Sequence, residues 1–240
     1  MSQRCVAFGV MRSGTSMLQD ALNGLEGCCV ADELLTHRPR NRLKHAKSIG
    51  LGPPSPYPKN ACRWLQERAL PRLEELGPTI HGFKLIQTQV DWVPSVTQIF
   101  TEDVKVVVTL RNPLASYVSY LQAITDKQWR RTNKAGPVER LVQVHVDPIG
   151  FKGWLFHRQQ MWETIGVMAN PVKLVLYGNL VDRFQETMAD VCDFLGVRWE
   201  HQPPKMSLIR PHPIKDRIAN WQTIRNELAP QYHHFLDDLQ

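Results

Sequence analysis

Short apolar runs that alternate with helical patterns dominate this chain. The first run covers residues 5–10 and is bounded by turn-forming residues, after which Met17, Leu18, Ala21 and Leu22 recur at helical spacing. This order predicts a strand, a loop and a helix at the start of the chain.

The same alternation returns further along the chain. We predict strands over residues 82–86, 104–110 and 172–177, and helices from about Pro113 and over residues 184–195. Buried strands that alternate with helices favour parallel βαβ units. The predicted fold class is therefore a three-layer α/β fold, in which helices flank a central, mainly parallel sheet.

Two polar stretches interrupt this rhythm, at about residues 37–60 and 128–147. The first is basic and then rich in Gly and Pro, so it is not one regular element, and the second is polar and mixed. Either stretch could be a linker, or a lid or acceptor-recognition loop of a single domain. A chain of 240 residues, 42% of them hydrophobic, favours a single domain over residues 1–240.

Charge and cysteine content narrow the functional classes. Lys and Arg (29) exceed Asp and Glu (23), and the formal charge of +6 favours polyanionic ligands such as nucleotides, nucleic acid or anionic surfaces. The five cysteines show no CxxC spacing, so neither a disulfide framework nor a zinc site is predicted. No apolar stretch has the length of a membrane span, and a cytoplasmic location is the default expectation.

Residues 12–16, which follow the first predicted strand, have the composition of an anion-binding loop. A strand that runs into a helix here places backbone N–H groups at a positive helix end, and Ser13, Thr15 and Ser16 add three hydroxyl groups. Gly14 permits a close approach of the backbone to a ligand, and Arg12 supplies a forked cation. We call residues 12–16 the anion loop.

One alternative to a phosphate-binding role stays open for this loop alone. Ser13 could cap the following helix while Arg12 is solvated. The loop also differs from the Walker signature, because Arg12 precedes Gly14 and no Lys follows it. ATP-dependent phosphoryl transfer with Mg²⁺ is therefore not favoured, and no metal is expected.

A second motif lies about a hundred residues further on. Arg111 stands at the end of a predicted buried strand, Pro113 can open a helix, and Ser119 follows Arg111 by eight residues (119 − 111). A cation at the strand end and a hydroxyl on the helix can clamp one further phosphate.

Together these motifs resemble those of the sulfotransferase superfamily. In that family a strand, an [R/K]-S-G-T-[S/T] loop and a helix bind the 5′-phosphosulfate of 3′-phosphoadenosine 5′-phosphosulfate (PAPS), and a strand followed by R-[N/D]-P-x5-S binds its 3′-phosphate. The resemblance spans roughly residues 5–221, apart from the two polar stretches. It implies a P-loop-like α/β fold, PAPS as co-substrate and adenosine 3′,5′-bisphosphate (PAP) as product.

The resemblance extends to two further donor-binding candidates. Tyr177 lies in a segment similar to the family's "YEDL … FLG" segment, whose tyrosine lies near the adenine, and Arg217 lies in a stretch similar to its late basic segment near the 3′-phosphate. Met17 replaces the usual adenine-stacking aromatic. That replacement favours the bacterial carbohydrate, nodulation-factor or tyrosylprotein type.

Sulfuryl transfer needs a group that takes a proton from the acceptor and cations that stabilise the developing charge. Glu33, 21 residues after Arg12 (33 − 12), lies in a segment that looks like the "GELL" of nodulation-type relatives, where a glutamate so placed is the proposed base. We therefore expect Glu33 as the base and Arg12 as a transition-state cation. Asp32, His37 and His81 are competing candidates for the base.

Lys84 is a charge within an otherwise apolar predicted strand. It could be a second cation at the sulfuryl group, or it could pair with a structural carboxylate.

The acceptor itself is not specified by any motif. A small molecule or a glycan is the expected partner, and nucleic acid is not. The alternatives are a P-loop kinase or nucleotidase, and a non-catalytic module that binds nucleic acid through the basic run at residues 37–47.

Overall fold

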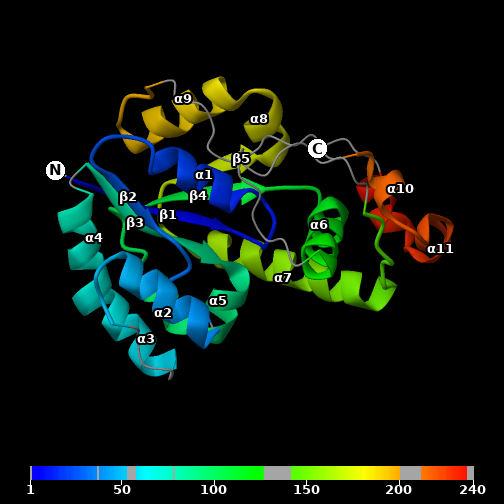
Figure 1. Cartoon of the computed structure of the whole chain (residues 1–240), viewed down its shortest axis with the longest axis horizontal. Helices are drawn as coiled ribbons and strands as arrows, with labels where there is room; N and C mark the ends of the chain where they lie inside the picture. The colour runs from blue at the N-terminus through cyan, green and yellow to red at the C-terminus, as the bar shows by residue number, and fades with distance from the viewer. Residues whose placement is uncertain are drawn as a thin grey trace.

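The structure, a computed structural model, describes residues 2–36, 38–52, 58–77, 79–126, 142–200 and 212–236. Its centre is a five-stranded sheet in which every neighbouring pair is parallel, in the order β2-β3-β1-β4-β5 (Figure 1). The strands are β1 (Gln3–Gly9), β2 (Cys28–Ala31), β3 (Ile80–Ile86), β4 (Lys105–Leu110) and β5 (Val172–Leu176).

Alternate residues of the strands enter two different hydrophobic cores. In β1, Val6 and Phe8 belong to one core, whereas Cys5 and Ala7 belong to the other. This is the two-residue period of a strand that is buried on both faces.

Helices cover both faces of the sheet and complete three layers (Figure 1). One face carries α1 (Thr15–Leu22), α8 (Tyr177–Asp182) and α9 (Phe184–Leu195). The other face carries the segments α2 (Pro39–Ser48), α3 (Pro58–Trp64), η1 (Leu65–Ala69), α4 (Leu70–Leu76), α5 (Gln87–Trp92), η2 (Pro94–Ile99) and the end of α7 (Pro148–Gly166). The predicted α/β class is confirmed.

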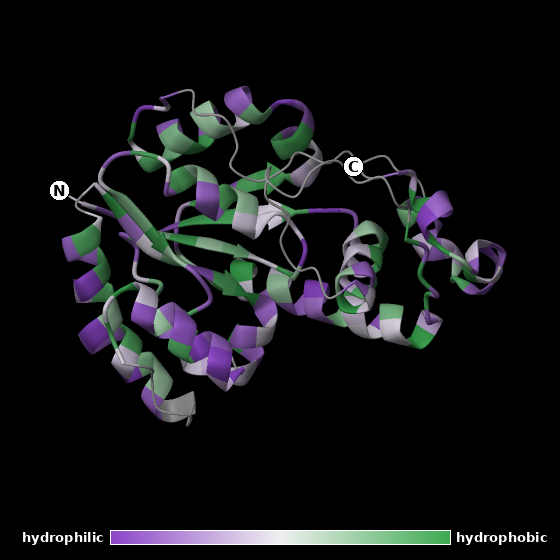
Figure 2. Cartoon of the chain, viewed as in Figure 1, coloured by the Kyte–Doolittle hydropathy of each residue, from purple (hydrophilic) through white to green (hydrophobic). Residues whose placement is uncertain are grey.

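A third core lies beside the sheet. It joins α6 (Pro113–Thr125) and the start of α7 to α10 (Ile214–Arg217), α11 (Trp221–Glu227) and η4 (Pro230–Phe235). A parallel bridge between Val144 and Ile218 links two segments of this group. Figure 2 shows apolar residues on α6 and at the start of α7. No helix in the part of the chain that the structure describes is long and apolar enough to cross a membrane.

The chain changes direction across the sheet at β1. It passes from β1 to β2 and β3 on one side, and then crosses to β4 and β5 on the other. Ligands of open parallel sheets bind at the carboxyl ends of strands next to such a switch point. The anion loop follows β1 at that position.

The polar stretch at about residues 37–60 contains more regular structure than its composition suggests. Helix α2 occupies residues 39–48 and α3 begins at Pro58. Of the second stretch, only residues 142–147 lie within the described part of the chain.

Candidate functional site

The anion loop has the backbone geometry of a tight turn into a helix. Gly14 is the N-cap of α1 with a φ of 107°, and a Cβ atom there would lie 2.9 Å from Cδ2 of Tyr177. Arg12 has a φ of 65° and is the one non-glycine residue with a positive φ in the described ranges. Left-handed backbone at a non-glycine residue costs on the order of 1 kcal/mol and concentrates at functional sites.

The hydroxyl groups of the loop have different surroundings. Ser13 is fully buried, and its Oγ donates to the Val10 carbonyl at 2.8 Å and lies 2.8 Å from Oγ1 of Thr109. Thr15 is also buried, whereas Ser16 accepts a hydrogen bond from Lys84 at 3.0 Å. The Ser13 hydroxyl therefore holds the loop against β4. The backbone N–H of Ser13 is the group that can bind an anion.

The two phosphate-binding motifs predicted from the sequence meet in the fold. Nε of Arg12 donates to Oγ of Ser119 at 3.1 Å, and Nη1 of Arg111 donates to the Arg12 carbonyl at 3.2 Å. The Asn112 side chain accepts from the Ala115 N–H at 3.1 Å and caps α6, which carries Ser119. The motifs therefore form one site at the ends of β1 and β4.

Arg111 is a buried cation that lacks an anionic partner among the described residues. It is 8% exposed, its guanidinium lies 4.1 Å from the centre of the Tyr177 ring, and its Nε has no hydrogen-bond partner. Burial lowers the pKa of this guanidinium from its ordinary value. A buried charge is costly unless it is paired. The surroundings of Arg111 therefore fit a bound anion such as a phosphate group.

Arg217 reaches the same region from α10. Its Nη2 donates to Oε1 of Gln122 at 2.7 Å, and Gln122 follows Ser119 by three residues on α6. Residues at that spacing lie on one face of a helix. Arg217 is therefore anchored one turn away from Ser119.

A second cluster faces the anion loop from the β2 and β3 side. Nζ of Lys84 lies 2.7 Å from Oδ1 of Asp32 and 2.9 Å from Oε1 of Glu33, and it also donates to Ser16. An ammonium group has three donors, and these contacts use all of them. The structure thus brings Lys84 and Glu33 together, with Lys84 paired to two carboxylates.

Sequence reasoning missed three neighbours of these clusters. Nε2 of Gln89 donates to Oε2 of Glu33 at 3.3 Å, and Nδ1 of His45 lies 3.5 Å from Oδ2 of Asp32. Nη1 of Arg158 donates to the Arg111 carbonyl at 2.9 Å, and burial lowers its pKa. Of these three residues, only Gln89 could have been found from the sequence, because it is a polar residue shortly after a predicted buried strand.

His81 lies away from both clusters. It pairs in register with Arg4 and Cys29, near the amino ends of the strands, and both of its ring nitrogens are buried without a hydrogen-bond partner. Burial lowers the pKa of this imidazole. The geometry therefore does not bring His81 to the anion loop, and His37 lies outside the described residues.

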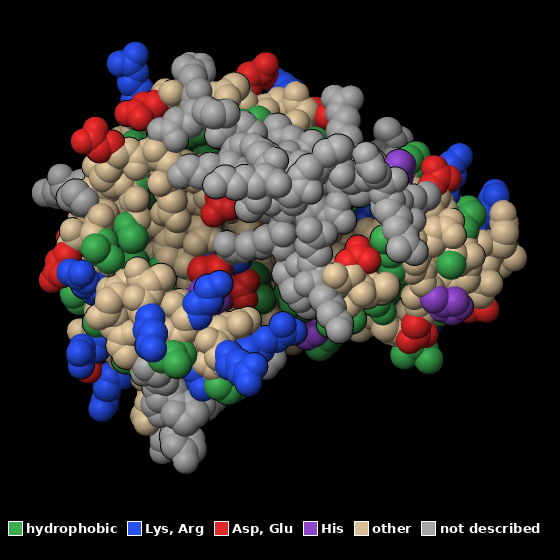
Figure 3. Space-filling view, in the orientation of Figure 1, with side chains coloured by type: hydrophobic (Ala, Val, Ile, Leu, Met, Phe, Trp, Pro, Cys, Tyr) green, Lys and Arg blue, Asp and Glu red, His purple; other side chains and the backbone are tan. Residues whose placement is uncertain are grey.

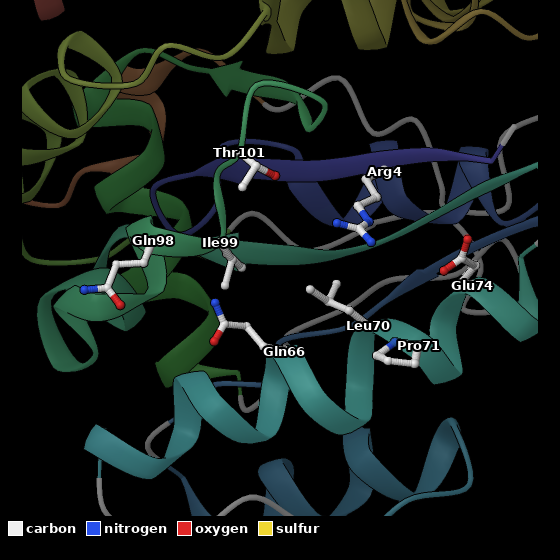
Figure 4. A pocket seen from close by; sticks show the side chains of 8 residues that line it. All are labelled: Arg4, Gln66, Leu70, Pro71, Glu74, Gln98, Ile99 and Thr101. Carbon is white, nitrogen blue, oxygen red and sulfur yellow. The ribbon is translucent and has the colours of Figure 1, made fainter.

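A cavity of about 200 Å³ opens near that opposite end of the sheet (Figure 4). Its lining residues are Arg4, Gln66, Leu70, Pro71, Glu74, Gln98, Ile99 and Thr101. None of the predicted site residues lines it.

Comparison with known proteins identifies the class that this fold and site define. The sulfotransferase domain family matches residues 3–216, and the chain belongs to that family. The family and the fold support a sulfotransfer function. Among curated proteins no relative matches.

Solved structures with the same fold are distant in sequence. A sulfotransferase domain from the curacin biosynthetic pathway is 14% identical with a TM-score of 0.57, and covers 98% of this chain and 96% of its own. The sulfotransferase domain of a Synechococcus olefin synthase is 15% identical with a TM-score of 0.55, at 98% and 93% coverage. A sulfotransferase from Alicyclobacillus acidocaldarius is 16% identical with a TM-score of 0.50, at 88% and 87% coverage.

Proposed function

We propose that this protein transfers the sulfuryl group of PAPS to a hydroxyl or amine of a small-molecule or glycan acceptor. The observation that carries the proposal is Arg111, a buried guanidinium without an anionic partner among the described residues, next to the anion loop. A donor with phosphate groups at the 3′ and 5′ positions of its ribose would supply one anion to Arg111 and one to the anion loop. A nucleotide without a 3′-phosphate would leave one of the two cationic positions without a partner.

The donor-binding residues have distinct roles in this proposal. The backbone N–H groups of residues 13–16 and the Arg12 guanidinium would hold the phosphosulfate, while Arg111, Ser119 and Arg217 would hold the 3′-phosphate. Tyr177 packs on both Gly14 and Arg111, so its ring would lie between the two proposed phosphate positions. An adenosine moiety that bridges these positions would contact this ring.

The acceptor side of the proposed site is the Lys84 cluster, which consists of Lys84, Asp32, Glu33 and Ser16. In sulfuryl transfer the acceptor oxygen forms a bond to sulfur as the bond between sulfur and the bridging phosphate oxygen breaks, and the acceptor proton passes to a base. Glu33 is the proposed base, because its carboxylate is 26% exposed and faces Ser16 through Lys84. Lys84 is proposed as a positioning residue that holds Glu33 and Asp32 beside the loop.

In this proposal the Arg12 guanidinium and the anion loop stabilise the charge that develops during the transfer. Charge develops on the sulfuryl oxygens and on the departing phosphate, and preorganised donors stabilise such charge more than water does. The left-handed backbone of Arg12 and its hydrogen bond to Ser119 hold that guanidinium in place before the donor binds.

A transfer assay with ³⁵S-labelled PAPS and pooled acceptors tests the proposal, with sulfated products identified by mass spectrometry. We expect Glu33→Gln to bind PAP like the wild type and to lose turnover by about 100-fold or more, as for loss of a general base. Gln89→Ala removes a hydrogen bond to Glu33 and the bond from the Ile86 N–H but leaves the Glu33 carboxylate in place, so it should lose far less turnover. Near-normal turnover in Glu33→Gln would exclude Glu33 as the base, and absence of PAP binding by the wild type would refute the proposed donor.

A further inference from the structure

Helix α2 presents a basic surface beside the Lys84 cluster. Arg40, Lys44 and Lys47 are exposed and follow one another at spacings of four and three residues, which places them on one face of the helix. The helix contains no Asp or Glu. Figure 3 shows Lys and Arg side chains gathered over α2. We call these three residues the α2 basic face.

This face has no carboxylate partner in the described ranges. No Asp or Glu there lies within ion-pairing distance of Arg40, Lys44 or Lys47, whereas exposed Arg63 and half-buried Arg72 have partners at Glu67 and Glu75. Exposed charges of one sign raise the local concentration of oppositely charged solutes within a Debye length, about 8 Å at physiological ionic strength. The α2 basic face therefore favours an anionic solute.

The opposite side of helix α2 packs against the reaction site. His45 lies 3.5 Å from Asp32, whose other oxygen binds Lys84. Arg42, three residues before His45, is 6% exposed and lies 5.5 Å from the Trp92 ring, with its Nη1 lacking a hydrogen-bond partner. Helix α2 is thus fixed to the acceptor side of the site, on the β2 and β3 side of the anion loop.

We infer that the acceptor carries an anionic group, such as a carboxylate, phosphate or sulfate, which the α2 basic face binds while the acceptor hydroxyl faces Glu33. In the proposed function the donor would lie near Arg111 and Tyr177, which are not part of the α2 basic face. The inference rests on the proposed function for the identity of the reaction. It goes further by naming the chemical class of the acceptor.

Fluorescence anisotropy with labelled oligosaccharides tests the inference in the full chain with PAP present. The probes are hyaluronan, chondroitin sulfate and phosphomannan oligosaccharides, with neutral dextran of equal length and a single-stranded oligonucleotide of equal charge. We expect at least one anionic saccharide to bind more tightly than dextran, and its Kd to rise by about tenfold in the triple variant Arg40→Glu, Lys44→Glu, Lys47→Glu.

A matched variant separates local binding from net charge. Arg68→Glu, Lys152→Glu and Arg225→Glu make the same change in total charge at exposed positions on three other elements. This control should bind the anionic saccharide within about twofold of the wild type. Equal losses in both triple variants, equal binding of dextran, or tighter binding of the oligonucleotide than of every saccharide would overturn the inference.

Calorimetric titration with PAP distinguishes this inference from the proposed function. The α2 variant should keep its PAP affinity, because the altered side chains are not among the donor-binding residues. Failure of the wild type to bind PAP would refute the proposed donor. Loss of PAP binding in the α2 variant alone would instead show that the face belongs to the donor site, and would also overturn the inference.

Discussion

Replacement of Arg111 by Met removes the buried cation at the end of β4 and retains an unbranched side chain. In the protein without ligand, the substitution loses a hydrogen bond to the Arg12 carbonyl and the stacking of the guanidinium on Tyr177. These contacts are worth about 1.5–3 and about 2 kcal/mol. Relief of the desolvation of an unpaired charge offsets them by several kcal/mol. We therefore expect the free energy of unfolding to stay within about 1 kcal/mol of the wild type.

The effect on donor binding should be much larger. A guanidinium that holds a phosphate by charge-assisted hydrogen bonds contributes about 3–4 kcal/mol, which corresponds to a loss of about 100-fold to 1,000-fold in PAP affinity. At a PAP concentration about 100 times the wild-type Kd, ligand binding stabilises the wild type by about 2.7 kcal/mol and the variant by about 0.4 kcal/mol or less. For a chain of 240 residues this predicts rises in Tm of about 5–11 °C and about 1 °C, respectively.

Thermal unfolding with and without PAP measures both effects in one experiment. Arg111→Met should keep the Tm of the unliganded protein and lose most of the ligand-induced rise. An unchanged rise would show that Arg111 does not bind the donor. A fall in the unliganded Tm that is as large as the lost rise would show that Arg111 has a structural role.

Three further predictions follow from the structure. Arg12→Gly removes the strain of a left-handed backbone and should be more stable than Arg12→Ala by about 1 kcal/mol in denaturant unfolding. Both variants should lose turnover in the PAPS assay. Equal stability of the two variants would show that the backbone at position 12 is not strained. Lys84→Met leaves Asp32 and Glu33 without their shared cation and should destabilise the protein by about 2 kcal/mol or more in urea, in contrast to Arg111→Met. Because burial holds the pKa of His81 below its ordinary value of 6.5, the unfolded chain binds a proton there more readily, and stability falls as the pH falls through that value. His81→Leu should be more stable at neutral pH by about 1–3 kcal/mol and lose less stability between about pH 7.5 and about pH 5.5, whereas parallel pH profiles would exclude a contribution of His81.

Much of the sheet was predictable because β1, β3 and β4 are mostly buried and are therefore largely apolar runs. Strands β1, β3, β4 and β5 and helix α9 lie within a few residues of the positions predicted from the sequence. Strand β2 has only four residues and was missed as an element. The helix α7 was also missed, although Asp147 accepts from the N–H groups of Ile149 and Gly150 as a capping residue, and Pro148 occupies its first turn.

The place of a candidate residue in the fold was predictable where that residue closely follows a strand. Arg12 and Arg111 come shortly after β1 and at the end of β4, and parallel strands bring their carboxyl ends to one edge. The contact between Gln89 and Glu33 joins residues 56 apart, and that between Arg158 and Arg111 joins residues 47 apart. Such contacts depend on how helices pack on the sheet, which no local pattern records.

The partners of Lys84 also needed the structure. A lysine in a buried strand indicates a partner, but the sequence does not show that Asp32 and Glu33 share it with Ser16. This arrangement links the predicted base to the anion loop through one ammonium group. Of the two alternatives left open by the sequence, the structure shows the pairing with carboxylates, and one of these carboxylates belongs to the candidate base Glu33.

Calorimetric titration of the wild type with PAP, in buffer containing a metal chelator, tests the central claim most directly. The parallel titrations use ATP with Mg²⁺ and adenosine 5′-monophosphate, which lacks the 3′-phosphate. The account predicts metal-independent binding of PAP that is at least about 100-fold tighter than binding of either other nucleotide. Absence of PAP binding, or tighter binding of ATP with Mg²⁺, would contradict it.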